Sequence, residues 1–373
     1  MAAPDTAVVG GGVVGLAVAA ALARAGRPVV LFERDDGFGR ETTSRNSQVV
    51  HAGLYYPEGS RKARSCVRGR ELLYERCARE GLPHRRLGKW VVACEDAELG
   101  RLEALCARGT ANGAPGLRIV DGAELARAEP CVRGVAALHS PSSGIVDAAA
   151  LCLSLAAEAE AHGATLLRRT AVVAIEPAGA GYRLVAETDG ERSAAQVAAV
   201  VNAAGLAADR VGALVGLDAA ARGEATRFCK GDYFALAPAA GVTLSRLVYP
   251  LPSGAGLGIH ATLDLGGRIR LGPDAEFVAA PRYDVDPAKA GVFADAAARY
   301  LPALGGRADW LTPDQAGVRP RLAGPGEAPR DFVVREESAA GRPGFVTLAG
   351  IESPGLTAAL AIGEEVASLL RPL

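Results

Sequence analysis

Residues 5–33 read DTAVVGGGVVGLAVAAALARAGRPVVLFE, and this stretch decides the fold. The apolar runs at 5–9 and 28–32 predict two strands that are buried on both faces of a parallel sheet. Between them, the alanine-rich segment 16–25 predicts a helix that ends at Gly26, a residue suited to a helix C-terminus. A strand, a glycine turn, a helix and a second strand together form a βαβ unit of the Rossmann type.

The glycine turn has the spacing G-x-G-x-x-G, formed by Gly10, Gly12 and Gly15. In such a turn the first glycine permits the tight bend, the second lets the backbone approach a pyrophosphate, and the third lets the helix pack on the strand. The helix N-terminus supplies free amides to the diphosphate, and Glu33, after the next strand, is expected to accept hydrogen bonds from a ribose. The glycines alone would also fit an ordinary turn, so the prediction of a dinucleotide site depends on the flanking strand, helix and acid together.

Helical and strand patterns alternate through the middle of the chain, and strands dominate after about residue 216. We expect helices at 62–80 and 148–162, and strands at 87–94, 164–167, 171–175, 182–187, 196–201 and in KGDYFAL, RLVYPLP, GLGIHATL and RIRLGP. The segment 344–370 again predicts strand, turn and helix, and the Pro- and Gly-rich stretch 319–329 predicts a loop. This order predicts an α/β fold in which a discontinuous Rossmann-like domain carries an inserted, strand-rich α+β substrate domain. The expected boundaries are 1–85, 145–215 and 315–373 for the first domain, and 86–144 and 216–314 for the second.

Composition excludes several classes of protein. Lys and Arg number 41 against 42 Asp and Glu, so no overall charge attracts nucleic acid or an anionic membrane. The seven cysteines are scattered without a C-x-x-C pair, which disfavours a disulfide framework or a zinc site, and we expect no metal. No uncharged apolar run reaches the roughly 20 residues of a spanning helix, although peripheral membrane contact stays open. The N-terminal residues lack the basic segment of a signal peptide, so we expect a cytoplasmic protein.

Two later segments choose between FAD and a nicotinamide cofactor. VNAAGLAAD (201–209) and LAGIESPGLT (348–357) each lead a strand into a turn of small residues, where backbone can approach a large flat cofactor. They resemble the later cofactor-contacting segments of FAD enzymes in the D-amino-acid oxidase, or glycine oxidase-like, superfamily. No second G-x-G-x-x-G lies on a strand-to-helix turn, since Gly254, Gly256 and Gly258 precede a strand. The expected cofactor is therefore FAD, which the substrate reduces directly.

The expected FAD contacts lie in the glycine turn, in the segments that follow it and in the later small-residue turns. Hydroxyl and amide side chains after residue 42 suit phosphate oxygens and the flavin. The full set is Gly10, Gly12, Val13, Gly15, Glu33, Arg34, Thr43, Ser44, Asn46, Ser47, Val172, Ala204, Gly205, Gly350, Ser353, Gly355, Leu356 and Thr357.

A longer resemblance runs through nearly the whole chain. TSRNSQVVHAGLYYP (43–57), followed by GSRKARSCVRG (59–69), resembles the motif of L-2-hydroxyglutarate dehydrogenases and oxidases. The similarity continues in SGIVD (143–147), KGDYFAL (230–236), VYPLP (248–252), GLGIH (256–260), LGPDAE (271–276), GVRPRL (317–322) and IESPGLTAAL (351–360). This resemblance implies oxidation of (S)-2-hydroxyglutarate to 2-oxoglutarate by hydride transfer to FAD.

That reaction requires a base, because oxidation of a secondary alcohol leaves a carbonyl and releases the hydroxyl proton. A neutral histidine suits the role. Of the five histidines, His260 and His51 lie in glycine-flanked segments that match the family motifs, whereas the other three are expected on the surface. His260 is the preferred base and His51 the second. His51 could instead contact the flavin or be linked to it covalently, and the sequence leaves these alternatives open.

A dicarboxylate substrate also requires cations at its two ends, ideally an arginine fork at one of them. Arg319 and Arg321 in GVRPRL are the leading candidates, and Arg319 is the expected partner of the substrate carboxylate. Lys62, Tyr55 and Tyr249 are expected to complete the substrate site. Each arginine could equally be a solvated loop charge.

Three other functions compete with this one. HAGLYY also resembles a motif of glycerol-3-phosphate dehydrogenases, but Tyr55 stands where that family has an arginine. An amino-acid or amine oxidase of the glycine oxidase type fits the paired histidines less well, and a flavin-binding partner without turnover would not need so many polar groups. The electron acceptor, whether oxygen, a quinone or an electron-transfer protein, is not encoded by any motif.

Overall fold

The βαβ unit predicted around the glycine turn is confirmed. The structure is a computed structural model that describes residues 5–252 and 258–370. Strand β1 (Thr6–Val9) leads through the turn into helix α1 (Val13–Arg24), and β2 (Val29–Phe32) lies parallel to β1. The helix begins at Val13 rather than at Leu16, because Val13 is already buried and follows the extended backbone of Gly12 directly.

A six-stranded sheet carries this unit, in the order β20-β21-β13-β1-β2-β9. The additional strands are β9 (Thr165–Leu167), β13 (Ala199–Asn202), β20 (Val333–Glu337) and β21 (Arg342–Ala349). Neighbouring strands are parallel except for β20, which runs antiparallel to β21. Segments far apart in the chain therefore meet in one sheet, while the domain boundaries themselves stay a prediction.

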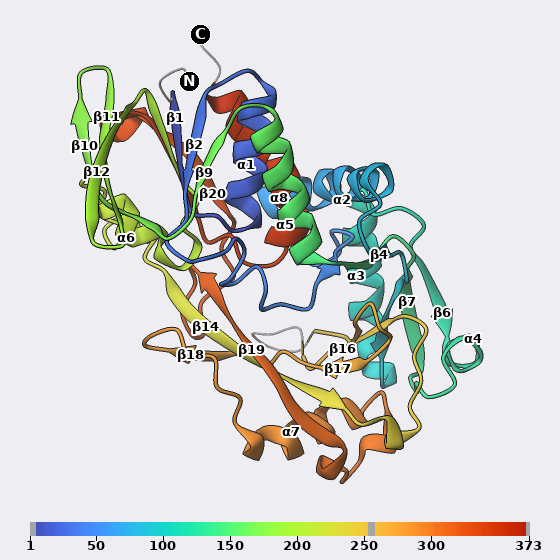
Figure 1. The fold of residues 1–373 in the computed structure, drawn as a ribbon. Coiled ribbons are helices and arrows are strands. Elements are labelled where there is room, and N and C mark those ends of the chain that lie inside the picture. Colours follow the sequence, from blue (N-terminus) through green and yellow to red (C-terminus); the bar gives the residue numbers. More distant parts are fainter. Residues whose placement is uncertain (1–4, 253–257, 371–373) are drawn as a thin grey trace.

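The two faces of this sheet are covered differently (Figure 1). Helices α1, α5 (Ala148–Ala161) and α8 (Gly355–Leu369) pack on one face, and α2 (Arg61–Glu80) packs on α8. The other face is covered by a three-stranded sheet of β10 (Thr170–Ala178), β11 (Gly181–Thr188) and β12 (Glu191–Val197). Because side chains alternate along a strand, Val8 packs among the helices whereas Val9 packs against the three-stranded sheet.

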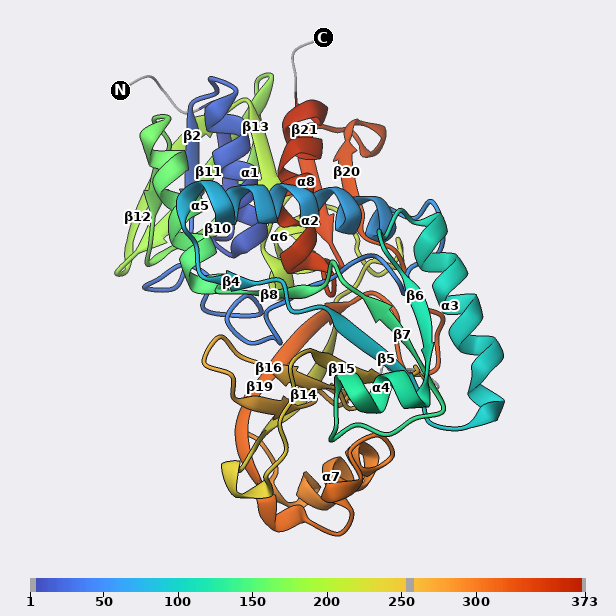
Figure 2. The same cartoon turned by 90° about the vertical axis from the view of Figure 1, so that its right-hand side faces the viewer.

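A nine-stranded sheet forms the second half of the molecule (Figures 1 and 2). Its strands follow the order β18-β14-β17-β16-β15-β5-β7-β6, and β19 pairs with β14 outside this path. In Figure 1, β14 and β19 extend from beside the first half down to α7. The elements of this half are β5 (Lys89–Ala93), α3 (Leu99–Ala111), β6 (Arg118–Asp121), α4 (Gly122–Ala128), β7 (Ala136–Ser140), β14 (Arg227–Leu236), β15 (Leu247–Pro250), β16 (Ala261–Leu263), β17 (Ile269–Leu271), β18 (Glu276–Val278), α7 (Ala290–Ala298) and β19 (Leu311–Arg321).

A small three-stranded sheet and one short helix complete the fold. Strands β3 (Val49–Val50), β8 (Gly144–Val146) and β4 (His84–Arg85) form a small sheet between the halves, in the order β3-β8-β4. Helix α6 (Ala208–Ala213) follows β13 and contacts β21. The small sheet places the segment after β3 next to helix α8, which matters for the site described below.

Three predictions about local structure are wrong. Residues 319–321 belong to β19 and not to a loop, because β19 is an edge strand among the described residues and tolerates a proline there. Residues 196–201 are not one strand, since the chain leaves the three-stranded sheet after Val197 and enters the six-stranded sheet at Ala199. His139, expected on the surface, is half-buried and its ring lies 4.4 Å from that of Trp90. Gly254 and Gly256 lie outside the described residues.

Residues 5–252 and 258–370 contain neither a membrane-spanning helix nor a cluster of metal ligands. No helix of this part is long and apolar enough to cross a bilayer. His, Cys, Asp and Glu side chains in the same part do not gather into a group that could hold a metal ion. The seven cysteines all carry free thiols.

Candidate active site

The three glycines of the turn meet different surroundings. A Cβ on Gly15 would lie 1.9 Å from the Gly10 carbonyl oxygen, and a Cβ on Gly10 would lie 2.5 Å from the Ala203 oxygen. Close packing of α1 and of the segment after β13 around the turn therefore requires these two glycines. A Cβ on Gly12 would meet one described atom within 4 Å, the Thr43 hydroxyl oxygen at 3.2 Å. Gly12 thus borders a side of the turn that the chain leaves open.

The N-terminus of α1 suits an anion at that open side. Gly12 provides no capping side chain, and the first turn of the helix carries no acidic residue. The Thr43 hydroxyl oxygen accepts a hydrogen bond from the Val13 N–H at 3.1 Å, which holds the TSRNS loop (43–47) against the helix end. The remaining amides and the helix dipole are available to phosphate oxygens. These residues fit the diphosphate of FAD.

Glu33 lies beside the turn, at the end of β2. Its carboxylate accepts hydrogen bonds from the Gly11 N–H at 2.7 Å and from the Asp35 N–H at 2.9 Å. Burial raises the pKa of Glu33, and these two hydrogen bonds oppose the rise. The carboxylate keeps further lone pairs, and a hydrogen bond from a ribose hydroxyl to Glu33 stays a prediction. Arg34 instead lies at the surface, where it pairs with Glu41 at 3.0 Å.

Polar side chains of the TSRNS loop mostly shape the loop itself. The Ser44 hydroxyl and the Asn46 amide donate hydrogen bonds to backbone carbonyl oxygens of residues 40–43. The Ser47 hydroxyl differs, since it lies 3.0 Å from the Tyr233 hydroxyl on β14. This contact joins the loop to the nine-stranded sheet, so the loop lies where the two halves meet.

The later small-residue turns surround the same edge of the six-stranded sheet. Ala204 and Gly205 follow Ala203 after the end of β13, and Ala203 and Ala204 lie beside Gly10. In the first turn of α8, the Thr357 hydroxyl accepts a hydrogen bond from the His51 N–H at 3.0 Å and donates to the Val49 oxygen. Gly355 and Leu356 lie in the same first turn of α8, and Gly350 and Ser353 lie between β21 and α8. Val172 instead lies on β10, half-buried against the opposite face of the sheet.

The two candidate bases lie in different environments. His51 places Nε2 3.4 Å from the Ser353 hydroxyl, and its buried Nδ1 has no hydrogen-bond partner within the described residues. Burial, together with the nearby Lys89 charge, lowers the pKa of His51 to about 3, so the ring is neutral but weakly basic. His260 is buried and stacks on Tyr249, with ring centroids 3.6 Å apart and planes at 10°. His51 enters from the segment after β3, and His260 from the strand-rich half.

The predicted cations fall into two groups. Lys62 and Arg321 lie 2.9 Å and 3.3 Å from the Glu352 carboxylate, so both are already paired within the protein. Arg319 has no carboxylate partner in the described part of the chain, and its guanidinium donates to the Asp274 carbonyl oxygen at 3.0 Å. Of the three, Arg319 is therefore the cation whose charge stays available to a substrate.

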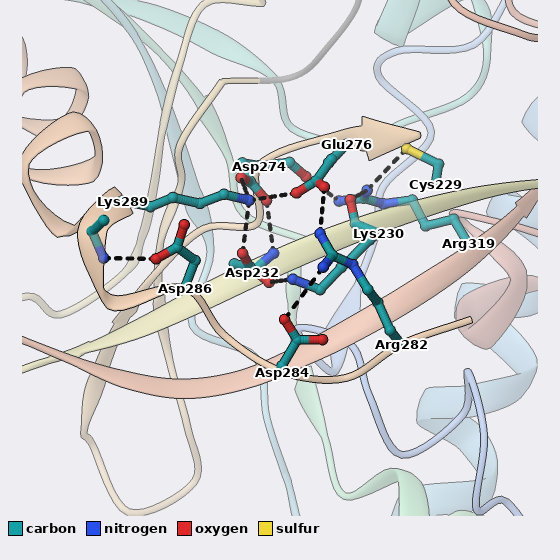
Figure 3. A network of polar contacts seen from close by, with 11 residues as sticks. Cys229, Lys230, Asp232, Asp274, Glu276, Arg282, Asp284, Asp286, Lys289 and Arg319 are labelled. Carbon is teal, nitrogen blue, oxygen red and sulfur yellow. Dashed lines mark hydrogen bonds and ion pairs between the residues drawn. The ribbon is translucent and has the colours of Figure 1, made fainter. Parts of the chain in front are cut away.

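An ion-pair network holds the carbonyl group that receives Arg319 (Figure 3). The Lys289 ammonium lies 2.8 Å from Asp232, 2.9 Å from Asp274 and 2.8 Å from Glu276. The Asp274 carboxylate also accepts a hydrogen bond from the backbone N–H of Asp232, which is completely buried. The network fixes β14 against the segment that contains Asp274, and in this way it orients the Arg319 side chain.

Sequence reasoning missed Lys89 and Tyr233. Lys89 begins β5, is completely buried, and its ammonium group has no hydrogen-bond partner among the described residues. It lies 4.7 Å from the ring centroid of Tyr55 and 4.5 Å from that of Tyr249. The available signal was a lysine inside the apolar segment LGKWVVAC, because lysine is almost never fully buried unless it is paired. Tyr233 carried no comparable signal, since a tyrosine is an ordinary residue of a strand.

Comparison with known proteins agrees with this geometry. Residues 5–369 match the FAD dependent oxidoreductase family, DAO. The protein named "L-2-hydroxyglutarate dehydrogenase, mitochondrial" from Arabidopsis thaliana is 40% identical to this chain, over 98% of this chain and 83% of its own length. The human protein of the same name is 37% identical over 73% of this chain and 60% of its own length.

Solved structures show the same fold. The FAD-bound L-alpha-glycerophosphate oxidase from Mycoplasma pneumoniae superposes with a TM-score of 0.88 at 27% identity, over 99% of this chain and 95% of that one. Glycine oxidase from Geobacillus kaustophilus superposes with a TM-score of 0.80 at 24% identity, over 98% of this chain and 94% of that one. The chain therefore belongs to the FAD dependent oxidoreductase family and, within it, groups with the L-2-hydroxyglutarate dehydrogenases.

Proposed function

We propose that this chain is an FAD-dependent enzyme that oxidises (S)-2-hydroxyglutarate to 2-oxoglutarate. The observation that carries the proposal is Arg319, a partly buried cation that no described carboxylate compensates, at the junction of the two halves. Tyr233 links Arg319 to the cofactor side. Its hydroxyl lies within hydrogen-bond distance of the Ser47 hydroxyl, and Ser47 belongs to the TSRNS loop. Burial raises the pKa of Tyr233, whereas the nearby charge of Arg319 and the hydrogen bond with Ser47 lower it. A 40% identical relative named for this substrate supports the same assignment.

The residues of the site divide the work of the reaction. FAD, when bound, supplies the acceptor for the two electrons that leave the hydroxyl carbon. Arg319 holds the carboxylate next to that carbon and so orients the hydroxyl group. His260 takes the hydroxyl proton, and we prefer it to His51 because a histidine whose pKa is lowered to about 3 is a poor proton acceptor at neutral pH. Tyr55 and Tyr249 line the substrate.

Anaerobic reduction of the purified, FAD-loaded protein tests this function. Candidate substrates are (S)-2-hydroxyglutarate, its R enantiomer, lactate, malate, glycerol 3-phosphate and glycine, and the readout is the bleaching of the flavin absorbance. We expect (S)-2-hydroxyglutarate to exceed lactate by about 100-fold or more in kcat/KM, because the shorter acid leaves a buried cation unpaired. Equal rates with lactate would show that the second carboxylate is not recognised, and an unbleached flavin would contradict the proposal altogether.

Oxidation of glycerol 3-phosphate is the second candidate. The solved structure with the TM-score of 0.88 is an L-alpha-glycerophosphate oxidase, and a glycerol 3-phosphate dehydrogenase from Caloramator mitchellensis is 29% identical over 98% of this chain. Tyr55 argues against it, because an uncharged phenol replaces an arginine that would pair with phosphate. Faster bleaching with glycerol 3-phosphate than with (S)-2-hydroxyglutarate would reverse this order.

We also propose a reducing compartment, such as the cytoplasm, because the seven cysteines are free thiols. Oxygen, a quinone and an electron-transfer protein remain candidates for the electron acceptor. A quinone acceptor would require the protein to reach a membrane surface. Reoxidation of the bleached enzyme by air, by a soluble quinone or by neither separates the three.

A further inference from the structure

A buried lysine, Lys89, lies in the strand-rich half of the molecule. Lys89 has 0% exposure and begins β5, between neighbours on β7 and β15. Its ammonium group finds no hydrogen-bond acceptor among the described residues. A charged group taken out of water without an acceptor is costly, so its retention in a buried strand indicates a ligand that supplies the acceptor.

The described residues around Lys89 include polar groups but give its ammonium no carboxylate partner. The ammonium group lies over the rings of Tyr55 and Tyr249, at 4.7 and 4.5 Å from their centroids. The Tyr55 hydroxyl and the His51 Nδ1 are likewise buried without hydrogen-bond partners in the part of the chain that is described. Burial lowers the pKa of Lys89 to about 7, and the proximity of Cys66 opposes the shift. An anion bound at this place would restore the full charge of the lysine.

Lys89 connects to the proposed substrate site through aromatic rings. Tyr249, under the ammonium group, stacks on the proposed base His260 at 3.6 Å. Burial raises the pKa of Tyr249, and the neighbouring Tyr233 adds to the rise, which places Tyr233 close to Tyr249. Tyr233 in turn lies near Arg319. Lys89 and Arg319 therefore both neighbour one group of aromatic side chains that includes Tyr249 and Tyr233.

Two other buried lysines, Lys62 and Lys230, differ from Lys89 because each has a carboxylate partner. Lys62 pairs with Glu352 at 2.9 Å, and Lys230 pairs with Asp232 at 2.5 Å. Lys89 alone among these three has no carboxylate partner within the described residues. A substrate with two carboxylates needs two cations, and the site offers Arg319 and Lys89.

We propose that the Lys89 ammonium binds the carboxylate at the far end of the substrate, while Arg319 holds the carboxylate next to the hydroxyl carbon. This inference rests on the proposed function and deepens it, because it assigns the residue that distinguishes a dicarboxylate from a monocarboxylate. Lys89 is then a specificity-determining residue of a site that takes short 2-hydroxy dicarboxylates.

The test compares (S)-2-hydroxyglutarate with (S)-2-hydroxypentanoate, in which a methyl group replaces the far carboxylate. Anaerobic flavin reduction gives kcat/KM for each substrate in the parent and in Lys89→Met, both loaded with FAD. We expect the ratio of the two kcat/KM values to fall by about 30-fold or more in the variant, because a charged hydrogen bond to one substrate is lost. The rate with (S)-2-hydroxypentanoate should stay the same or rise.

Arg246→Met is the matched control. Arg246 lies beside the same strand with its guanidinium carbon 5.6 Å from the Trp90 ring, and Trp90 follows Lys89 and therefore faces the opposite side of β5. Removal of this cation should leave the ratio unchanged. If Lys89→Met does not fold, Lys89→Gln, which is polar and nearly as long, carries the same comparison.

The outcomes separate this inference from the proposed function. A parent that (S)-2-hydroxyglutarate does not reduce overturns both. A parent that is reduced, together with a Lys89→Met variant that keeps the parental ratio, overturns the role of Lys89 alone. A variant with an unchanged ratio but with a shifted flavin spectrum or lowered FAD content would show that Lys89 serves the cofactor, which also overturns the proposal.

Discussion

The two sides of the site are built by different means. On the side of the six-stranded sheet, the proposed cradle for the diphosphate consists of glycines and backbone amides within six consecutive residues, 10–15. On the side of the nine-stranded sheet, the recognising groups that we propose are the side chains of Lys89, His260 and Arg319, which come from segments far apart in the chain. A cofactor shared by many enzymes can be bound by backbone, whereas a particular substrate is recognised by side chains. Specificity can therefore change on the second side without any change to the first.

The largest expected effect comes from a substitution that disrupts the cofactor side alone. Gly12→Val should abolish FAD retention, because the new side chain would fill the open side of the turn where the diphosphate approaches. Gly100→Val in α3 is the control, since a Cβ there has no described atom within 4 Å, and it should keep its flavin. Visible absorbance and the FAD released on denaturation measure the outcome. A folded Gly12→Val protein with parental flavin content would show that the cradle lies elsewhere.

The next effect tests which side supplies the base. His260→Ala should slow anaerobic flavin reduction by (S)-2-hydroxyglutarate about 100-fold or more, which is a usual contribution of general base catalysis. Substrate binding should weaken only modestly. His51→Ala serves as the comparison, and stopped-flow reduction of both variants gives the rates. If His51→Ala is the slow variant instead, the base belongs to the cofactor side, and if neither is slow the proton leaves by another route.

A smaller effect separates binding from chemistry on the substrate side. Arg319→Ala should lower kcat/KM by about 10- to 100-fold, because a guanidinium that holds a carboxylate contributes charged hydrogen bonds. Most of the loss should appear as a raised KM, with some loss of kcat through misalignment. Arg321→Ala is the control, since Arg321 is paired with Glu352, and it should change KM less. A larger loss of kcat/KM in Arg321→Ala than in Arg319→Ala would show that Arg321, and not Arg319, holds the substrate carboxylate.

The smallest effect is a pH dependence that only the substrate side should show. Lys89 has a pKa lowered to about 7, so it is charged below that value and loses its charge as pH rises. Its neighbours do not titrate between pH 5 and 9, because the pKa of His51 is about 3, that of Cys66 is about 12, and burial raises those of Tyr55 and Tyr249. The kcat/KM for (S)-2-hydroxyglutarate should therefore fall above pH 7, by up to about tenfold per unit. The ratio of this value to that for (S)-2-hydroxypentanoate should fall in parallel, and a flat ratio would contradict the assignment of Lys89.

The sequence by itself determined the cofactor side. The glycine spacing, the apolar strands on either side and the alanine-rich helix are local features, and local steric constraints act identically wherever the unit occurs. The βαβ unit, α5 and the closing turn into α8 could all be predicted from such patterns, and the prediction of a dinucleotide cofactor followed from them. The choice of FAD depended on the resemblance of two later turns to those of FAD enzymes. The family motifs added His51, His260 and Arg319 as candidate site residues. They did not indicate in which environment each histidine lies.

Tertiary structure alone decided which charges are free. Lys62 and Arg321 matched the motifs as well as Arg319 did, yet Glu352 pairs with both of them across more than thirty positions of sequence. Lys89 is a candidate because β5 is buried between β7 and β15, with Tyr55 and Tyr249 beside the ammonium group. The physical reason is that the availability of a charge depends on burial and on partners from distant segments, which no local pattern encodes.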